Sequence, residues 1–478
     1  MKTKLLRGKY MAMAISGAVL SIIMLIACNR AQSAFTEGNI YETLISQMLA
    51  EERSYDITSS EKGVIKTPVR ADPSDFLIFP FNEMPTVPAS EPWGDMADMD
   101  AMMRDLYQCG FNAAAFIETK YLKHARENHL MGMLLRNRIP SDKDTPEIAD
   151  SHINRLLSSI TDSLDMKAVH SIFLCDEPKM PDFPLLKIWT DAIKRQNVIP
   201  YNVIPYINLF SSVIESTVIP DYDEYLNQYI EYCDPSHFSY HYYPFKLEKV
   251  NVGGVYKLER VFRSKQFYSA LEKMREKSQE TGIPFWNVIL SIPHLNLAET
   301  TEETLALQVY SALAYGSKGI GHFTYYTSDK GNYRHGAIDR FGHRTPTWDL
   351  IRNINLQIHS IVPIYKDLKS VNVFHTETIP GNGDVSEYTL LVDSVKGYSA
   401  ISDNAPLLVG EFENPIDNKP YAIVVNKDIE FPAVIKFKFK GYETDTVVVV
   451  SQANQLPPLF QGYHKYLSPG SGVLLTIK

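Results

Sequence analysis

Short apolar runs alternate with amphipathic helical stretches between residue 75 and about residue 368. A buried parallel strand reads as such a run, whereas a helix places apolar residues three and four positions apart. Three of the helical stretches end at Gly110, Gly282 and Gly316, and glycine is typical of a helix C-terminus. Eight runs qualify as strands: 75–81, 113–117, 131–135, 172–175, 204–210, 238–243, 285–291 and 319–326. Separating helices are predicted at 94–108, 148–164, 183–196, 260–280 and 302–315. Eight β/α units predict an α/β fold of the (β/α)8 TIM barrel type.

A doubly wound open sheet is the competing fold. That fold carries a Gly-rich phosphate loop after its first strand. Here the first predicted strand is followed by Asn82-Glu83-Met84-Pro85 instead. The barrel is therefore favoured.

The pattern changes from Val371 onward, where short β-rich runs are separated by Gly, Pro, Asn and Asp. This predicts a C-terminal all-β sandwich domain, joined to the barrel by a very short connection that favours rigid packing. The predicted division is a signal peptide at 1–27, a tether and N-terminal arm at 28–73, a catalytic barrel at 74–368 and the sandwich at 369–478.

The N-terminus is typical of an export signal. Lysines and one arginine precede an apolar stretch from Met11 to Ile26, which closes in Leu25-Ile26-Ala27-Cys28. This segment resembles a bacterial lipoprotein signal with its lipobox, so Cys28 is the expected lipidation site. An uncleaved membrane anchor is less favoured because the stretch is short for a bilayer span. We expect an exported lipoprotein of the outer membrane, on its periplasmic or cell-surface face.

Charge and cysteine content narrow the classes of partner. The formal net charge is −9 and basic runs are absent from the sequence, which argues against nucleic acid. Once Cys28 carries lipid, Cys109, Cys175 and Cys233 remain, an odd number that fits no disulfide framework. A neutral or weakly charged ligand suits this balance. The sequence carries no signal for an oligomeric state.

Two carboxylates follow the fourth predicted strand, where the run from His170 to Cys175 leads into Asp176-Glu177-Pro178. Barrel enzymes keep their chemistry at the carboxyl ends of the strands. The alternative is that Asp176 and Glu177 only cap the helix that follows them. The barrel pattern favours the catalytic interpretation.

Other strand ends carry amides, carboxylates, histidines and aromatic rings, a mixture that suits a sugar. Strand alternation lets only one of the neighbouring tyrosines Tyr242 and Tyr243 face inward. The candidate substrate-binding residues are Asn82, Glu118, Asn208, His241, Tyr242, Trp286, His294, Tyr325 and Asp329.

These elements resemble clan A glycoside hydrolases, and in particular lipoprotein relatives with an Asp-Glu-Pro on the fourth strand. The matching segments are Asp176-Glu177-Pro178, Asn208-Leu209-Phe210 and Tyr243-Pro244. The resemblance implies that Glu177 is the general acid/base and that Asp176 takes the position of an Asn. It also implies a β-sandwich after the barrel.

The chain departs from that pattern on the seventh strand, where the family's nucleophilic glutamate is absent from the run between Trp286 and His294. Glycoside cleavage normally needs a second carboxyl group. Glu83, Glu118 and Asp329 are the candidates, although each also has a structural interpretation as a cap, a solvated side chain or a turn residue.

A metal site built from His241, His294 and Glu177 is a weak alternative, because these residues lie on separate strands and form no compact ligand motif. We expect neither a metal nor a cofactor. The sequence thus predicts a lipid-anchored glycoside hydrolase acting on an oligo- or polysaccharide, with Glu177, Asp176 and Glu83 as catalytic residues. The alternative is a non-catalytic glycan-binding lipoprotein on a degenerate glycosidase barrel.

Overall fold

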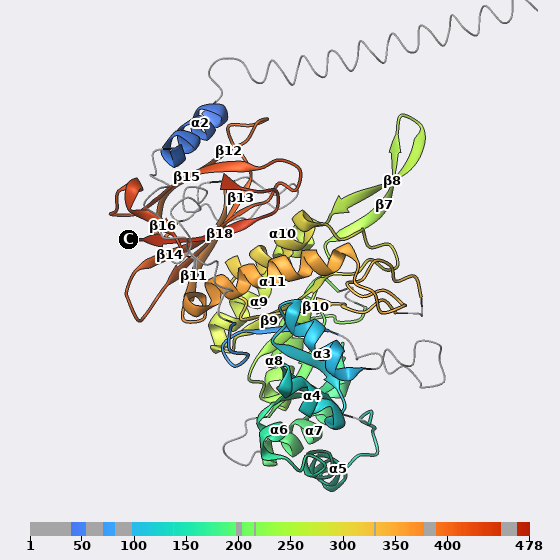
Figure 1. Cartoon of the computed structure of the whole chain (residues 1–478). Helices are drawn as coiled ribbons and strands as arrows, with labels where there is room; N and C mark the ends of the chain where they lie inside the picture. Colours follow the sequence, from blue (N-terminus) through green and yellow to red (C-terminus); the bar gives the residue numbers. More distant parts are fainter. Residues whose placement is uncertain are drawn as a thin grey trace, which may run out of the picture.

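The chain forms a mixed α/β part followed by antiparallel sheets (Figure 1). The structure is a computed structural model, and it describes residues 40–53, 70–81, 98–136, 138–196, 203–214, 217–328, 331–376, 389–450 and 466–478. Cys28 and most of the predicted arm at 28–73 lie outside these residues.

The described α/β part contains two four-stranded sheets in which every pairing is parallel. Their orders are β2-β3-β4-β5 and β1-β10-β9-β6. The strands are β1 (Leu77–Pro80), β2 (Ala113–Ile117), β3 (Met131–Leu135), β4 (Val169–Asp176), β5 (Ile204–Asn208), β6 (Phe238–His241), β9 (Phe285–Leu290) and β10 (Gly319–Phe323).

The edges of these two sheets meet at both sides. Between β1 and β2, the Asn112 amide N–H donates to the Ile78 carbonyl oxygen at 3.1 Å, and the Ile78 N–H donates to the Asn112 side chain at 2.7 Å. Between β5 and β6, the Leu209 N–H donates to the Ser239 carbonyl oxygen at 2.7 Å. The eight strands therefore follow one another in chain order, which is consistent with the predicted barrel.

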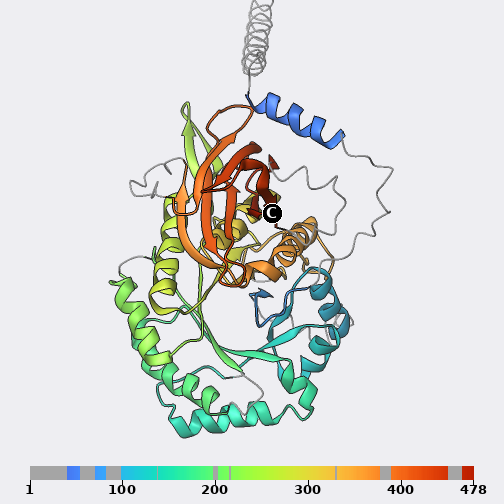
Figure 2. The same cartoon turned by 90° about the vertical axis from the view of Figure 1, so that its left-hand side faces the viewer.

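Helices follow most of these strands and lie outside the sheets (Figures 1 and 2). The α-helices of this part are α3 (Met99–Gln108), α4 (Leu122–Glu127), α5 (Pro146–Ser158), α6 (Ser163–Lys167), α7 (Phe183–Arg195), α8 (Tyr222–Cys233), α9 (Ser264–Thr281), α10 (Glu302–Ala314) and α11 (Pro346–Tyr365). Short 3-10 helices are η3 (Thr119–Tyr121) and η4 (Met180–Asp182).

Alternate residues of the strands enter two different cores. In and beside β1, Leu77, Phe79 and Phe81 belong to an inner cluster with Tyr206 and Trp286. Their neighbours Phe76 and Ile78 pack in the larger outer cluster, which includes the surrounding helices. A strand buried on both faces needs apolar residues at nearly every position, which is why these strands read as continuous apolar runs.

The C-terminal antiparallel sheets fit a β-sandwich, with a five-stranded sheet in the order β11-β13-β14-β18-β16 and a three-stranded sheet in the order β12-β15-β17. The strands are β11 (Lys369–His375), β12 (Val392–Tyr398), β13 (Leu407–Glu413), β14 (Pro420–Asn426), β15 (Ala433–Phe439), β16 (Val447–Val449), β17 (Tyr466–Leu467) and β18 (Gly472–Ile477), with η5 (Thr444–Thr446) before β16.

The five-stranded sheet is buried on both faces. On β14, Ala422 and Val424 pack in a core between the two sheets. Tyr421, Ile423 and Val425 join the outer core of the α/β part, where α10 lies against β13, β14 and β18. The sandwich and the α/β part therefore share one continuous apolar core.

Helix α2 (Ile40–Arg53) packs on the outside of the sandwich (Figure 1). Tyr41, Leu44 and Ile45 contact Tyr398 and Val434 in a small separate cluster. None of the described helices is long and apolar enough to cross a membrane.

A two-stranded hairpin follows β6, and the sequence patterns did not predict it. Strands β7 (Phe245–Val252) and β8 (Val255–Phe262) pair antiparallel along their whole length. The predicted helix at 260–280 is wrong at its start, because residues 260–262 complete β8 and α9 begins at Ser264.

The predicted helix at 148–164 is also two helices, α5 and α6. The Asp162 side chain accepts a hydrogen bond from the Leu164 N–H at 2.7 Å, which caps a new helix rather than continuing the first one.

Gly410 on β13 tests the contact between the sandwich and the α/β part. A Cβ atom at this position would overlap the carbonyl oxygen of Ala314 in α10. We expect Gly410→Ala to lower the free energy of unfolding by about 1–3 kcal/mol, measured by urea denaturation. Glu413→Ala, at the exposed end of the same strand, is the control. If Gly410→Ala unfolds at the same urea concentration as the wild type, the close contact is not present.

Candidate functional site

The carboxyl ends of β4, β5 and β6 bring three polar side chains together: Glu177, Asn208 and His241. The Glu177 N–H donates to the Asn208 carbonyl oxygen at 2.8 Å, so the residue after β4 is still tied to β5. The His241 Nε2 atom lies 3.1 Å from the Glu177 Oε1 atom. About 42% of the Glu177 side chain is exposed, so this carboxyl group can meet a ligand.

Glu177 adopts a left-handed backbone conformation, with φ at +51°. A residue with a Cβ atom adopts this conformation rarely, because the Cβ atom crowds the backbone. Backbone strain of this kind clusters at functional sites, where the surrounding structure holds it in place. Here the bond to β5 and the buried Pro178 fix the turn on either side of Glu177.

A chain of hydrogen bonds behind Glu177 orients the site. The Tyr206 hydroxyl lies 2.9 Å from the Ser239 hydroxyl, which donates to the Asn208 Oδ1 atom at 3.0 Å. The Asn208 Nδ2 atom in turn donates to the Asp176 Oδ1 atom at 2.8 Å and lies 2.9 Å from the His241 Nδ1 atom. Asn208, Ser239 and Tyr206 are all fully buried, so this chain is rigid.

The hydrogen bonds assign the protonation of His241. The Asn208 Nδ2 group can only donate, so the His241 Nδ1 atom accepts and the proton of the neutral ring sits on Nε2. That proton points at the Glu177 Oε1 atom. Glu177 therefore keeps its other carboxyl oxygen, Oε2, for a ligand.

Asp176 differs from Glu177 in its electrostatics. Desolvation by the surrounding protein raises the pKa of the Asp176 carboxyl, and the neighbouring Glu177 raises it further, against the opposing effects of His241 and Asn208. The residue is nevertheless exposed, so solvent screens the charge and its cost to folding is small. Asp176 holds the amide of Asn208 in place.

Aromatic rings stand beside this polar cluster. Tyr243 lies with its ring centroid 5.2 Å from His241 and stacks on Phe323 at 5.5 Å. His294 stacks on Tyr333 at 4.8 Å and also contacts Phe323 at 5.2 Å. Burial lowers the pKa of His294, which favours its neutral form. Flat, neutral rings next to hydrogen-bonding groups are what the faces of a sugar ring require.

The structure brings together some of the predicted residues, namely Asp176, Glu177, Asn208, His241 and His294. Tyr242 points away from them, and its neighbour Tyr243 takes the inward position. Alternation along the strand from His241 selects Tyr243, so the prediction of Tyr242 is corrected. Phe323 and Tyr333 were also missed, because their approach depends on how β10 and its loop fold.

Two predicted substrate-binding residues lie elsewhere. Tyr325 is fully buried, and its hydroxyl bonds to Asp105 and, at 2.9 Å, to Trp348. Trp286 lies at the start of β9, at the opposite end from Glu177. Both predictions are corrected: an aromatic residue on a strand reaches the ligand end only near the strand's carboxyl terminus.

Of the three candidates for the second carboxyl group, the structure describes Glu118. Glu118 follows β2, and its Oε1 atom lies 3.0 Å from the Lys120 Nζ atom. Asn82, Glu83 and Asp329 lie outside the described residues. Ser291, directly after β9, is fully buried, and its hydroxyl lies 2.8 Å from the His322 ring. The end of β9 is therefore packed in the core and presents no carboxyl group to a ligand.

Glu299 comes after β9 but its carboxylate is engaged. The Arg334 Nε atom donates to its Oε1 atom at 2.8 Å, and the His335 Nδ1 atom lies 3.0 Å from its Oε2 atom. Burial acts to raise the pKa of this carboxyl, but the hydrogen bonds from His335 and Arg334 lower it overall. Glu299 is therefore held as a charged partner of the loop at 331–335.

Neither a metal nor a reactive thiol is indicated by the described side chains. No three His, Cys, Asp or Glu residues among them lie close enough to hold a metal ion, so His241, His294 and Glu177 form no such group. The described cysteines are free. Burial raises the pKa of the Cys175 thiol to about 11, which keeps it protonated at neutral pH.

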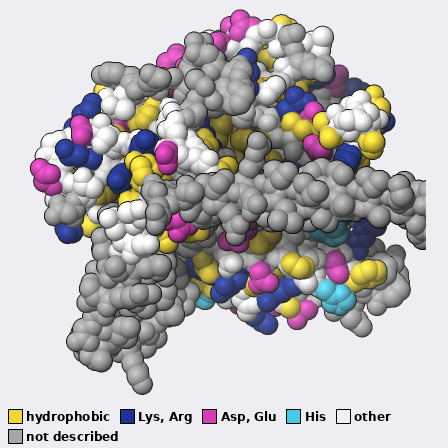
Figure 3. Space-filling view, turned by 90° about the horizontal axis from the view of Figure 1, so that it is seen from above, with side chains coloured by type: hydrophobic (Ala, Val, Ile, Leu, Met, Phe, Trp, Pro, Cys, Tyr) yellow, Lys and Arg dark blue, Asp and Glu magenta, His cyan; other side chains and the backbone are white. Residues whose placement is uncertain are grey.

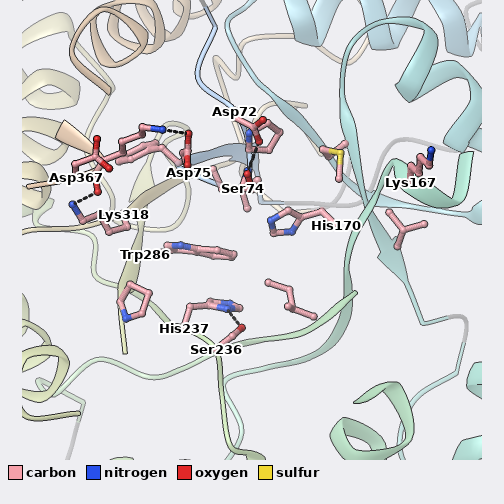
Figure 4. Close-up of a pocket in the computed structure, with 18 of the residues that line it drawn as sticks. Asp72, Ser74, Asp75, Lys167, His170, Ser236, His237, Trp286, Lys318 and Asp367 are labelled. Atoms are coloured by element: carbon pink, nitrogen blue, oxygen red, sulfur yellow. Dashed lines mark hydrogen bonds and ion pairs between the residues drawn. The ribbon is translucent and has the colours of Figure 1, made fainter. Parts of the chain in front are cut away.

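A cavity of about 920 Å³ lies at the other end of the strands, where they begin. His170, His237 and Trp286 line it (Figure 4), and the His237 ring stacks on the Trp286 ring at 3.7 Å. Burial lowers the pKa of His237 to about 3 and that of His170 to about 4. Both rings are neutral at physiological pH and belong to the packing around this cavity at the beginning of the strands.

No protein-family model matches this chain, and no curated protein matches it in sequence. Several solved structures are similar to it. A GH39 enzyme from Xanthomonas axonopodis pv. citri has a TM-score of 0.39 at 10% identity, covering 73% of this chain and 74% of that one. Gas2p from Saccharomyces cerevisiae has a TM-score of 0.38 at 11% identity, covering 59% and 60%. An endo-beta-1,4-glucanase from the same Xanthomonas has a TM-score of 0.37 at 9% identity, covering 54% and 90%. At these low TM-scores the likeness assigns neither a family nor a function.

The buried histidines predict a loss of stability in acid. Besides His237, burial lowers the pKa of His322 and His359 to about 4. A histidine in the unfolded chain has a pKa near 6.5. Below that pH the unfolded chain therefore binds more protons than the folded chain. Each buried histidine should therefore lower the free energy of unfolding by about 1.4 kcal/mol per pH unit, from about pH 6.5 down to its folded pKa.

Urea denaturation between pH 7 and pH 4 measures this dependence. His237→Gln should reduce the slope by about 1.4 kcal/mol per pH unit. His343→Gln changes a ring that is 77% exposed and should leave the slope unchanged. Equal slopes for the wild type and His237→Gln would contradict the neutral, buried state of His237.

Proposed function

We propose that this chain is a glycoside hydrolase acting on an oligo- or polysaccharide, with Glu177 as its general acid. The observation that carries the proposal is the position of Glu177: a partly exposed carboxyl group after β4, oriented by His241 and flanked by aromatic rings. The proposal takes the eight parallel strands as a closed (β/α)8 barrel, in which the ends of β4, β5 and β6 share one mouth with the loops after β1 and β10.

The reaction uses the free oxygen of Glu177. With its Oε1 atom accepting from His241, a protonated Oε2 atom gives its proton to the glycosidic oxygen as the bond to the anomeric carbon breaks. Water supplies the hydroxyl group to the anomeric carbon. Its remaining proton goes to the second carboxylate, or, in a retaining enzyme, restores the Glu177 carboxyl group.

The second carboxylate must stand across the sugar from Glu177. Asp176 adjoins Glu177 in the chain and holds Asn208, so it lies on the same side and supports the acid. Glu83 after β1 is the favoured second catalytic residue, with Glu118 and Asp329 as alternatives. A separation of about 5 Å between the two carboxyl groups would imply retention of configuration, and about 6.5–9.5 Å inversion.

One observation favours a second candidate function, a non-catalytic glycan-binding lipoprotein. Among the described residues, the end of β9 carries the buried Ser291 and no carboxylate. Such a protein would keep the aromatic rings and the Asn208 network for binding alone.

We further propose that Cys28 carries a lipid that anchors the protein to the outer membrane. The support is the basic segment, the apolar stretch and the Leu25-Ile26-Ala27-Cys28 sequence that precede the described residues.

Glu177→Gln tests the general acid. The amide keeps the size and hydrogen bonds of the side chain but has no proton to transfer, so hydrolysis of a natural glycan should fall by about a hundredfold or more. Glycan binding should persist, and aryl glycosides with good leaving groups should be affected less. Rates are measured by the release of reducing ends from a panel of polysaccharides.

Glu276→Gln, an exposed substitution on α9, is the matched control and should leave hydrolysis unchanged. If Glu177→Gln hydrolyses the natural glycan at the wild-type rate, Glu177 is not the acid. If the wild type binds a glycan without cleaving any, the non-catalytic alternative is the better account.

Cys28→Ser tests the anchor. Without the thiol no lipid can be attached, and the substitution lies outside the described fold. We expect mass spectrometry to find a diacylglyceryl group on Cys28 of the wild-type protein and no lipid on the variant. Fractionation of cells that make the variant should find no mature, lipidated form. An unmodified Cys28 in the wild type would refute the anchor.

A further inference from the structure

The tip of the β7–β8 hairpin, residues 249–258, is covered by no other described part of the chain. Every residue from 251 to 260 is exposed, including Val255 at 60%, Tyr256 at 62% and Leu258 at 71%. The strand register puts Val252 opposite Val255 on one face and leaves Tyr256 and Leu258 on the other. The tip is therefore apolar on both faces.

A two-stranded hairpin with exposed apolar residues on both faces is poorly suited to water. The tip also carries Lys249 and Lys257 and no Asp or Glu, although the chain as a whole has a net charge of −9. Apolar side chains flanked by lysines are the pattern of a surface that meets lipid headgroups, where the apolar groups enter the interface and the ammonium groups contact phosphates.

The tip of the β7–β8 hairpin and helix α2 lie at the same end of the molecule (Figures 1 and 2). Figure 3 looks onto this end, where hydrophobic side chains lie among basic and acidic ones. Cys28 precedes Ile40, the first residue of α2, by twelve positions, so a lipid on Cys28 would keep Ile40 within about 43 Å of the bilayer.

We propose that the tip of the β7–β8 hairpin docks on the membrane surface as a second point of attachment. This inference rests on the proposed lipid anchor but not on the proposed enzyme activity. The hairpin begins directly after Tyr243 and Pro244, at the candidate site. Docking of the tip fixes the orientation of the molecule and holds the site at a constant height above the bilayer.

The test uses the full, lipidated protein in vesicles of phosphatidylcholine and phosphatidylglycerol, compared with the same protein in detergent. Trypsin cleaves after Lys249, Lys257 and Arg260, which are accessible in the unbound hairpin. We expect cleavage at these three residues to be about tenfold slower or more on the vesicles. Vesicles of phosphatidylcholine alone should protect less, because the lysines then lack anionic lipid.

The double variant Val255→Asp and Leu258→Asp changes exposed residues only, so its fold should persist. It should float with the vesicles through its lipid but lose the protection of the tip. Leu164→Asp is the matched control: Leu164 is 51% exposed on α6, at the end of the molecule far from α2, and this variant should keep the protection.

Several outcomes overturn the inference, and each has a different meaning. A protein that floats with vesicles but is cleaved at the tip as fast as in detergent has its anchor and no docking. A protein without lipid that does not float refutes the anchor and the docking together. Protection that arises in detergent as the protein concentration increases assigns the tip to a second copy of the chain, and protection by added oligosaccharide assigns it to the substrate.

Discussion

The side-chain amide of Asn208 connects and orients the polar side chains at the ends of β4 and β6. It is fully buried, and its two donors and one acceptor meet Asp176, His241 and Ser239. Because an amide can donate only from nitrogen, this single residue sets the tautomer of His241 and thereby the hydrogen bond to Glu177. Leaving the buried Asn208 amide unpaired would cost about 1–3 kcal/mol, which favours this arrangement of the network.

Much of the fold could be predicted, because strands buried on both faces must be apolar at nearly every position. The runs at 113–117 and 131–135 became β2 and β3 with the predicted bounds. The β7–β8 hairpin could not be predicted in the same way, since beyond Phe245 none of its residues is buried, and no buried face imposes an alternation along its length. The break between α5 and α6 depends on one capping side chain, Asp162, in a segment whose apolar spacing is otherwise helical.

The candidate site was predictable where it depends only on strand ends. Asp176, Glu177, Asn208 and His241 each end or follow a strand, and parallel strands present these ends together. Trp286 was misplaced because its chemistry suits a sugar, while its position at the start of β9 puts it at the other end. Tyr333 lies in a loop, and its stacking on His294 requires a chain path that no local pattern encodes.

The two carboxyl groups that glycoside cleavage needs would differ in how firmly they are held. Glu177 follows a strand, is bonded to the neighbouring strand through its own N–H group, and receives a hydrogen bond from a fixed histidine. The end of β9, where a second rigid carboxylate could have stood, instead places Ser291 in the core with His322. Under the proposed function, a partner for Glu177 would follow another strand, with Glu83, Glu118 and Asp329 as the candidates, and the bound glycan would help to position it. In such an arrangement Glu177 is positioned before the glycan binds, and the second carboxyl group takes its position when the glycan is bound.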